Sequence, residues 1–196
     1  MAEPNPEELF NLGMLSYDKQ DFSKAKKYFE RACGLNNGRG CGALGVLYED
    51  GQGVEKNLTK ATQFYSKACD LNNGSGCNNL GDLYQNGEGI EKNLTKAAQF
   101  YSKACDLNNN KGCFNLGALY QNGQGVEKDL IKVAYFYTKA CDLKDGSGCF
   151  NLGELYLEKD SKKAVALFEK SCDLNISRGC GALGVLYYNG QGVEKT

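Results

Sequence analysis

Apolar side chains recur every three or four residues along the chain, which is the spacing of one face of an α-helix. One such stripe consists of Cys41, Leu44, Leu47 and Tyr48. A second stripe follows a polar, glycine-rich break and consists of Leu58, Ala61, Phe64, Tyr65 and Ala68. The chain lacks the period-two runs that are typical of β-strands. The pattern therefore predicts pairs of amphipathic helices and an all-α fold.

The ends of these helices carry their own sequence signals. Asn57 precedes the second stripe and is expected to cap the helix N-terminus, as is Asp129 two units further on. The residues "EDGQGVEK" at 49–56 interrupt the helical pattern. The residues "NNGSG" at 72–76 tolerate positive φ, so they are expected to close the second helix near Leu71.

The helix pair is the unit of an internal repeat. The phrases "LGVLYEDGQGVEKN", "LGDLYQNGEGIEKN" and "LGALYQNGQGVEKD" recur with a period of 36 residues. Residues 63–73 are identical to residues 99–109, which indicates duplication. The predicted units lie near 7–39, 40–75, 76–111, 112–147 and 148–178, followed by a terminal helix at 179–190.

One helix pair cannot cover its own apolar face, so neighbouring pairs must stack to complete the core. The predicted architecture is therefore an α/α superhelical solenoid of helix-turn-helix repeats that forms a single domain over residues 1–196. The first and fifth units carry "YDKQDFSKA" and "YLEKDSKKA" in place of the glycine loop, so their turns are about four or five residues shorter.

A glycine recurs inside the first helix of each pair, where it costs about 1 kcal/mol of helix propensity relative to alanine. We expect these glycines to permit close contact between helices. They are Gly13, Gly45, Gly81, Gly117, Gly153 and Gly184.

Charge and hydropathy exclude several classes of partner. The net charge is −1, so no broad basic field exists to hold nucleic acid or anionic lipid. No apolar run approaches the roughly 20 residues that cross a bilayer. The N-terminus lacks the charged and apolar regions of a signal peptide. The chain stops at "GQGVEKT", where another second helix would begin, as expected for a truncated piece of a longer array.

Ten cysteines occur without any histidine, which narrows the chemistry. Neither the Cys-x-x-Cys knuckles of zinc sites nor the Cys-x-x-Cys of thiol–disulfide enzymes is present. We therefore predict structural disulfides, no metal site and no cofactor. Disulfides persist in oxidising compartments, so the protein is expected to be secreted or periplasmic.

Two disulfide pairings fit the repeat. The cysteine near the end of a second helix joins the cysteine eight positions later, or the two cysteines of one unit pair, as in Cys41 with Cys69. Pairing within units leaves Cys33 and Cys180 unmatched, whereas sequential pairing uses all ten cysteines. Each sequential bridge is worth roughly 2–3 kcal/mol on the chain-entropy model. The predicted bridges are Cys33–Cys41, Cys69–Cys77, Cys105–Cys113, Cys141–Cys149 and Cys172–Cys180.

The phrases "LGVLY", "GQGVEK" and "KACDLN" resemble the Sel1-like repeat, a relative of the tetratricopeptide repeat with a longer turn between its helices. The cysteine pair eight residues apart resembles the secreted Helicobacter cysteine-rich protein family. The resemblance spans about residues 9–195 and implies an exported, disulfide-stapled α/α superhelix. It further implies either an adaptor that holds partner proteins or a protein of host interaction. Members of the cysteine-rich family are also described as binding penicillin-like compounds or cell-wall fragments, some as slow β-lactamases.

In such a solenoid the first helices line the inner surface. Two residues after the second cysteine of a pair lie Asn79, Asn115 and Asn151. Neighbouring helices lie roughly 8–10 Å apart and an extended peptide advances about 3.3 Å per residue, so these amides would meet a peptide about every third residue. By resemblance to tetratricopeptide relatives, we predict that all three bind peptide. The alternative is that they cap turns or bond neighbouring helices.

Other side chains are assigned to the core or to the solvent. Tyr135, Phe136 and Tyr137 sit at second-helix spacing and are expected in the core. Lys60 and Lys67, with their repeats, are expected on a solvated outer face.

One catalytic motif has to be considered. "SYDK" at 16–19 matches the Ser-x-x-Lys pattern of serine β-lactamases, but Ser-Asp-Asn and Lys-Thr-Gly are absent. We therefore assign no catalytic residue. The leading hypothesis is a secreted, non-catalytic scaffold that holds a peptide or protein partner, such as a host protein, in its concave groove. The alternative is a penicillin-binding protein with weak β-lactamase activity, or a binder of cell-wall fragments.

Overall fold

The computed structural model describes residues 4–190, and its regular structure over this range is α-helical. Odd-numbered helices are the first helices of the pairs and even-numbered helices are the second. The helices are α1 (Pro6–Asp18), α2 (Phe22–Gly34), α3 (Gly38–Asp50), α4 (Leu58–Asp70), α5 (Gly74–Asn86), α6 (Leu94–Asp106), α7 (Asn110–Asn122), α8 (Leu130–Asp142), α9 (Gly146–Tyr156), α10 (Ser161–Asp173) and α11 (Ser177–Tyr188). The predicted all-α fold of paired helices is confirmed.

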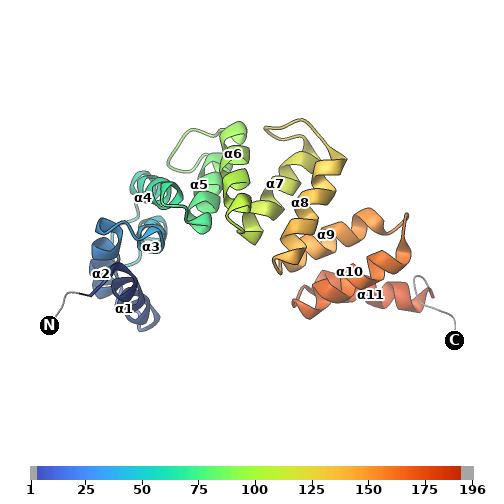
Figure 1. Cartoon of the computed structure of the whole chain (residues 1–196), viewed down its shortest axis with the longest axis horizontal. Coiled ribbons are helices and arrows are strands. Elements are labelled where there is room, and N and C mark those ends of the chain that lie inside the picture. The colour runs from blue at the N-terminus through green and yellow to red at the C-terminus, as the bar shows by residue number, and fades with distance from the viewer. Residues whose placement is uncertain (1–3, 191–196) are drawn as a thin grey trace. The chain divides into compact units, whose positions relative to one another are not determined.

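The chain divides into two compact units, residues 1–107 with α1 to α6 and residues 108–196 with α7 to α11. Within each unit, helices that are consecutive in the chain pack side by side as a repeat solenoid (Figure 1). Unit 1 has a core that includes Leu44 and Leu47, and unit 2 has a core that includes Val133 and Leu152. The single domain predicted over residues 1–196 stays a prediction.

The predicted helix caps are present. The Asn57 side chain accepts a hydrogen bond from the backbone N–H of Lys60 at 2.9 Å and so caps α4. Asp129 caps α8 in the same way. The short turns are also confirmed, because residues 19–21 join α1 to α2 whereas residues 51–57 join α3 to α4.

The recurring glycines allow an aromatic ring of the second helix to lie directly against the first helix. A Cβ atom built at Gly81 would lie only 2.6 Å from Cε1 of Tyr101, which is a separation that real side chains do not show. The same ring contact occurs in every complete helix pair, as Gly13 with Phe29, Gly45 with Tyr65, Gly117 with Tyr137 and Gly153 with Phe168. The expected close contact is thus confirmed for five of the six glycines, while nothing described lies within 4 Å at Gly184.

A second aromatic layer stacks beside these rings. Tyr120 stacks on Phe136 with ring centroids 5.6 Å apart, and the ring of Tyr137 is fully buried. Tyr135 is 59% exposed, so its predicted place in the core is wrong. The physical reason is that each residue turns the helix by about 100°, so the third of three consecutive rings cannot share the apolar face with the other two.

Short disulfides join each second helix to the next first helix. Cys69–Cys77 and its repeats Cys33–Cys41, Cys141–Cys149 and Cys172–Cys180 are formed, with Cα atoms 4.5–4.6 Å apart. Cys105 and Cys113 are also disulfide-bonded, and no cysteine of residues 4–190 is free.

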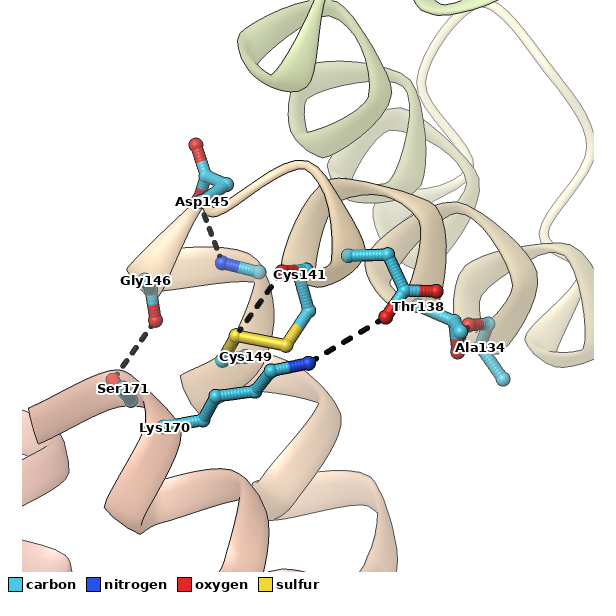
Figure 2. The surroundings of a disulfide bond; sticks show 10 residues. Ala134, Thr138, Cys141, Asp145, Gly146, Cys149, Lys170 and Ser171 are labelled. Carbon is cyan, nitrogen blue, oxygen red and sulfur yellow. Dashed lines mark hydrogen bonds and ion pairs between the residues drawn. A yellow bond between two sulfur atoms is a disulfide. The ribbon is translucent and has the colours of Figure 1, made fainter. Parts of the chain in front are cut away.

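Polar contacts surround the Cys141–Cys149 bridge (Figure 2). Asp145 caps α9, and the buried Ser171 hydroxyl of α10 donates a hydrogen bond to the Gly146 carbonyl at 2.8 Å. The disulfide thus lies at the point where three successive helices α8, α9 and α10 are fixed to one another.

Candidate functional site

The candidate site is the surface of the first helices that the second helices leave uncovered, called here the first-helix face. In unit 1 it includes an open hollow of about 150 Å³ between α1 and α3. The hollow has an apolar lining that consists of Met14, Tyr17, Phe29, Ala43 and Val46. An open, apolar hollow on a helical scaffold can hold one apolar side chain of a ligand.

A row of polar groups continues the face from the end of α3 to α5. The hydroxyl of Tyr65 donates a hydrogen bond to the carboxylate of Glu49. The hydroxyl of Tyr101 donates to Oδ1 of Asp82 at 2.7 Å and lies 2.9 Å from Oε1 of Gln85. These rings belong to the second helices, so their hydroxyls cross the interior and end among the polar groups of the first helices.

The tyrosine hydroxyls of this row stay protonated well above neutral pH. Burial is the main cause that raises the pKa of Tyr65 far above its usual range, and the hydrogen bond to Glu49 acts in the same direction. Burial likewise raises the pKa of Tyr101, with a further contribution from Asp82. Each phenol therefore acts as a hydrogen-bond donor that holds a carboxylate of the face in place.

The predicted peptide-binding asparagines lie on this face and are half-buried. The Asn79 side chain is hydrogen-bonded to the Tyr65 hydroxyl, and its Oδ1 lies 3.5 Å from Nδ2 of the buried Asn78. In unit 2, the Asn151 side chain is hydrogen-bonded to the Tyr137 hydroxyl. These contacts are of the kind that the alternative interpretation expects, in which the asparagines bond neighbouring helices.

The three asparagines do not form one described site. Asn79 belongs to unit 1, whereas Asn115 and Asn151 belong to unit 2 at matching positions of α7 and α9. A ladder of all three along one bound peptide stays a prediction.

Sequence reasoning missed the tyrosine hydroxyls. The signal that could have revealed them is the pairing of ring type with an acceptor at the end of the first helix. Gln121 is such an acceptor, and it lies 2.6 Å from the Tyr137 hydroxyl. Where the corresponding residue is Leu157, the ring is a phenylalanine, Phe168.

The buried phenols make stability depend on alkaline pH. An unfolded tyrosine ionises near pH 10, whereas the folded Tyr101 keeps its proton to higher pH, so its linked stability is complete below about pH 10 and is lost above it. We expect Tyr101→Phe to reduce the fall of unfolding free energy above pH 10 by up to about 1.4 kcal/mol per pH unit.

Urea unfolding at pH 8, 10 and 11 measures this change. The exposed Tyr135 supplies the control, because Tyr135→Phe should leave the slope unchanged. Equal slopes in the parent and Tyr101→Phe proteins would contradict the assignment.

The Ser-x-x-Lys motif does not present a free nucleophile. Ser16 is buried, and its Oγ donates a hydrogen bond to the carbonyl of Leu12 at 2.9 Å within α1. Ser16 and Lys19 line one hollow of about 170 Å³, but the serine hydroxyl is already engaged with the helix backbone. Among residues 4–190, no cluster of three or more metal-ligating side chains occurs, and no helix is long and apolar enough to cross a membrane.

Comparison with known families assigns almost the whole chain to helical repeats. The Sel1 repeat matches residues 39–73, 74–109, 110–145, 146–176 and 177–195. The tetratricopeptide repeat matches residues 6–39. These segments follow the helix pairs that the structure contains.

Three individual proteins illustrate the similarity. A Sel1 repeat protein from Oxalobacter formigenes superposes with a TM-score of 0.86 at 26% identity, covering 95% of this chain and 79% of that one. Cysteine-rich protein B of Helicobacter pylori is 43% identical, with a TM-score of 0.55, over 66% of this chain and 92% of its own. Beta-lactamase HcpA of Helicobacter pylori strain J99 is 55% identical over 58 residues, or 30% of this chain. The chain spans only about a fifth of the curated relatives that it matches.

Proposed function

The chain belongs to the Sel1 repeat family and is homologous to the Helicobacter cysteine-rich proteins, and on this basis we propose that it is a non-catalytic scaffold that holds an extended peptide segment of a protein partner. The segment binds to the first-helix face. Repeat scaffolds use such faces because each repeat offers the same spacing of ligand-contacting positions.

The observation that carries the proposal is the α1–α3 hollow beside the polar row of unit 1. Val46 and Ala43 form apolar walls that a leucine, valine or methionine side chain of the partner can fill. Asn79 lies on α5, the next first helix along the unit. Its amide makes contacts with Tyr65 and Asn78 and keeps further donor and acceptor capacity for a peptide backbone.

Charge narrows the class of partner. Glu49 and Asp82 lie in the polar row, and α5 has no basic residue. Opposite charges across an interface favour association, so the preferred segment has a lysine or arginine near its apolar anchor. In unit 2, Asn115 and Asn151 contribute equivalent amides.

The scaffold acts in an oxidising compartment, outside the cell or in the periplasm, because its short bridges must stay oxidised. We do not assign the hydrolase activity that the name of HcpA describes. Ser16 lacks an available hydroxyl, and no partner motif of a serine β-lactamase accompanies it.

Peptides selected from a random linear library on the immobilised, oxidised protein provide the test. Val46→Arg should weaken binding of a selected peptide by at least about tenfold because the new side chain fills the hollow. Asn79→Ala should weaken it by about fivefold, the value of one hydrogen bond. Isothermal titration calorimetry with the full chain measures both dissociation constants.

Gln99→Arg introduces the same side chain at an exposed position of α6 and serves as the matched control. Equal affinity of all three variants for every selected peptide would contradict the proposal. Turnover of a chromogenic cephalosporin that Ser16→Ala abolishes would contradict its non-catalytic part.

A further inference from the structure

The last first helix, α11, has an uncovered face. Nothing described lies within 4 Å of a Cβ built at Gly181 or Gly184. One turn further on, Tyr187 is 44% exposed, whereas the corresponding Tyr48 of α3 is 9% exposed. These three residues recur at intervals of three and therefore share one side of the helix. They are called the α11 face.

The chain itself shows what this face binds. Residues 39–48 of α3 and residues 178–187 of α11 have the same ten-residue sequence, "RGCGALGVLY". In α3 the positions that match the α11 face are Gly42, Gly45 and Tyr48, and helix α4 covers them.

The contacts of α4 specify the partner residue by residue. Ala68 lies against Gly42, and the ring of Tyr65 lies against Gly45. Phe64 stacks on Tyr48 with ring centroids 5.5 Å apart and an angle of 10° between the rings. A helix that fills the α11 face therefore needs two consecutive aromatic residues, followed three positions later by alanine.

Charge adds a fourth requirement. Lys67 of α4 donates a hydrogen bond to the carbonyl of Cys33, at the end of the preceding second helix, at 3.0 Å. At the same position of α10, Lys170 lies 3.6 Å from Asp142, at the end of α8. Helix α10 ends in the same way, with the exposed Asp173, which thus offers a carboxylate beside the α11 face.

We infer that the α11 face binds an amphipathic helix of a partner protein. This helix carries two adjacent aromatic residues, a lysine or arginine two positions after the second of them, and alanine at the next position. The second aromatic ring packs on Gly184, the first stacks on Tyr187, and the basic side chain contacts Asp173. The face is separate from the first-helix face of unit 1, so the inference does not depend on the proposed function.

A fluorescein-labelled peptide with the sequence of residues 57–71 serves as the probe, with Cys69→Ser to prevent disulfide exchange. Fluorescence anisotropy with the full oxidised chain should give saturable binding. Gly184→Leu should weaken it at least tenfold, because leucine occupies the space of the aromatic ring. Since Gly184 has open space around it, this variant keeps its fold.

Matched controls decide the outcome. Tyr188→Ala removes a 92% exposed ring of α11 outside the α11 face and should leave the affinity unchanged. A peptide with Phe64→Ala and Tyr65→Ala should lose binding, and one with Lys67→Glu should bind several-fold more weakly. Binding that Gly184→Leu leaves intact, or that the peptide without aromatic residues retains, would overturn the inference. Self-association that Gly184→Leu abolishes in sedimentation equilibrium would identify a second copy as the occupant and would also overturn it.

Discussion

Replacing Gly81 by leucine should lower the free energy of unfolding by about 2–3 kcal/mol. A Cβ at this position would lie 2.6 Å from Cε1 of Tyr101, and that ring is only 1% exposed, so it has no free space into which to move. Leucine is the better helix former by about 0.8 kcal/mol, so the loss is entirely steric. Urea unfolding followed by circular dichroism measures the change.

The same substitution at Gly184 is the internal control. Gly184 occupies the equivalent position of α11, where nothing described lies within 4 Å. Gly184→Leu should therefore raise the free energy of unfolding by up to about 0.8 kcal/mol, the gain in helix propensity alone. Equal losses at both positions would show that ring contact is not the reason for the glycine.

A second substitution tests the ring directly. Tyr101→Ala alone should cost about 3–5 kcal/mol, because it leaves a cavity in the core. In the double variant the leucine at position 81 occupies part of that cavity, so the combined loss should be smaller than the sum of the two by at least about 1 kcal/mol. Additive losses would mean that the two side chains do not compete for the same space.

The helix pairs and their contacts were largely predictable from the sequence. The apolar period located each helix, the cap signal at Asn57 located the start of α4, and the glycine at position 45 indicated a close contact. These features are local, or they recur in each repeat, so reading one unit was sufficient for all of them. The short distance between paired cysteines along the chain also limited their pairing.

The chemistry of the first-helix face was less predictable. Periodicity tells which Cα atoms share a face, but not how far a large side chain reaches. Tyr65 was expected only to fill the core, yet its hydroxyl crosses the core and meets Glu49 on the other side. The hollow at Val46 depends on the smaller volume of Ala43 beside it and on the packing of two helices, which no single stripe specifies.

Removal of one internal disulfide should have an effect as large as that of the glycine substitution. In Cys69→Ala/Cys77→Ala the bridge that closes a nine-residue loop is lost, because the two cysteines are eight positions apart. The chain-entropy model gives a loss of about 2–3 kcal/mol. Both cysteines are buried in unit 1, so lost packing of the sulfur atoms adds to the entropic loss. Urea unfolding of the parent and the variant, both without reducing agent, gives the difference.

The Cys172–Cys180 bridge separates the two contributions. Its loop has the same length, since the cysteines are again eight positions apart, but Cys172 is half-buried and Cys180 is exposed. Cys172→Ala/Cys180→Ala should therefore show the loop-closure loss of about 2–3 kcal/mol with little loss of packing. A larger loss for the Cys69–Cys77 pair would measure the packing of its sulfur atoms. If neither double variant is less stable than the parent, the bridges are not the staples of adjacent repeats, and the hydrogen bonds and ring contacts between helices hold the repeats together without them.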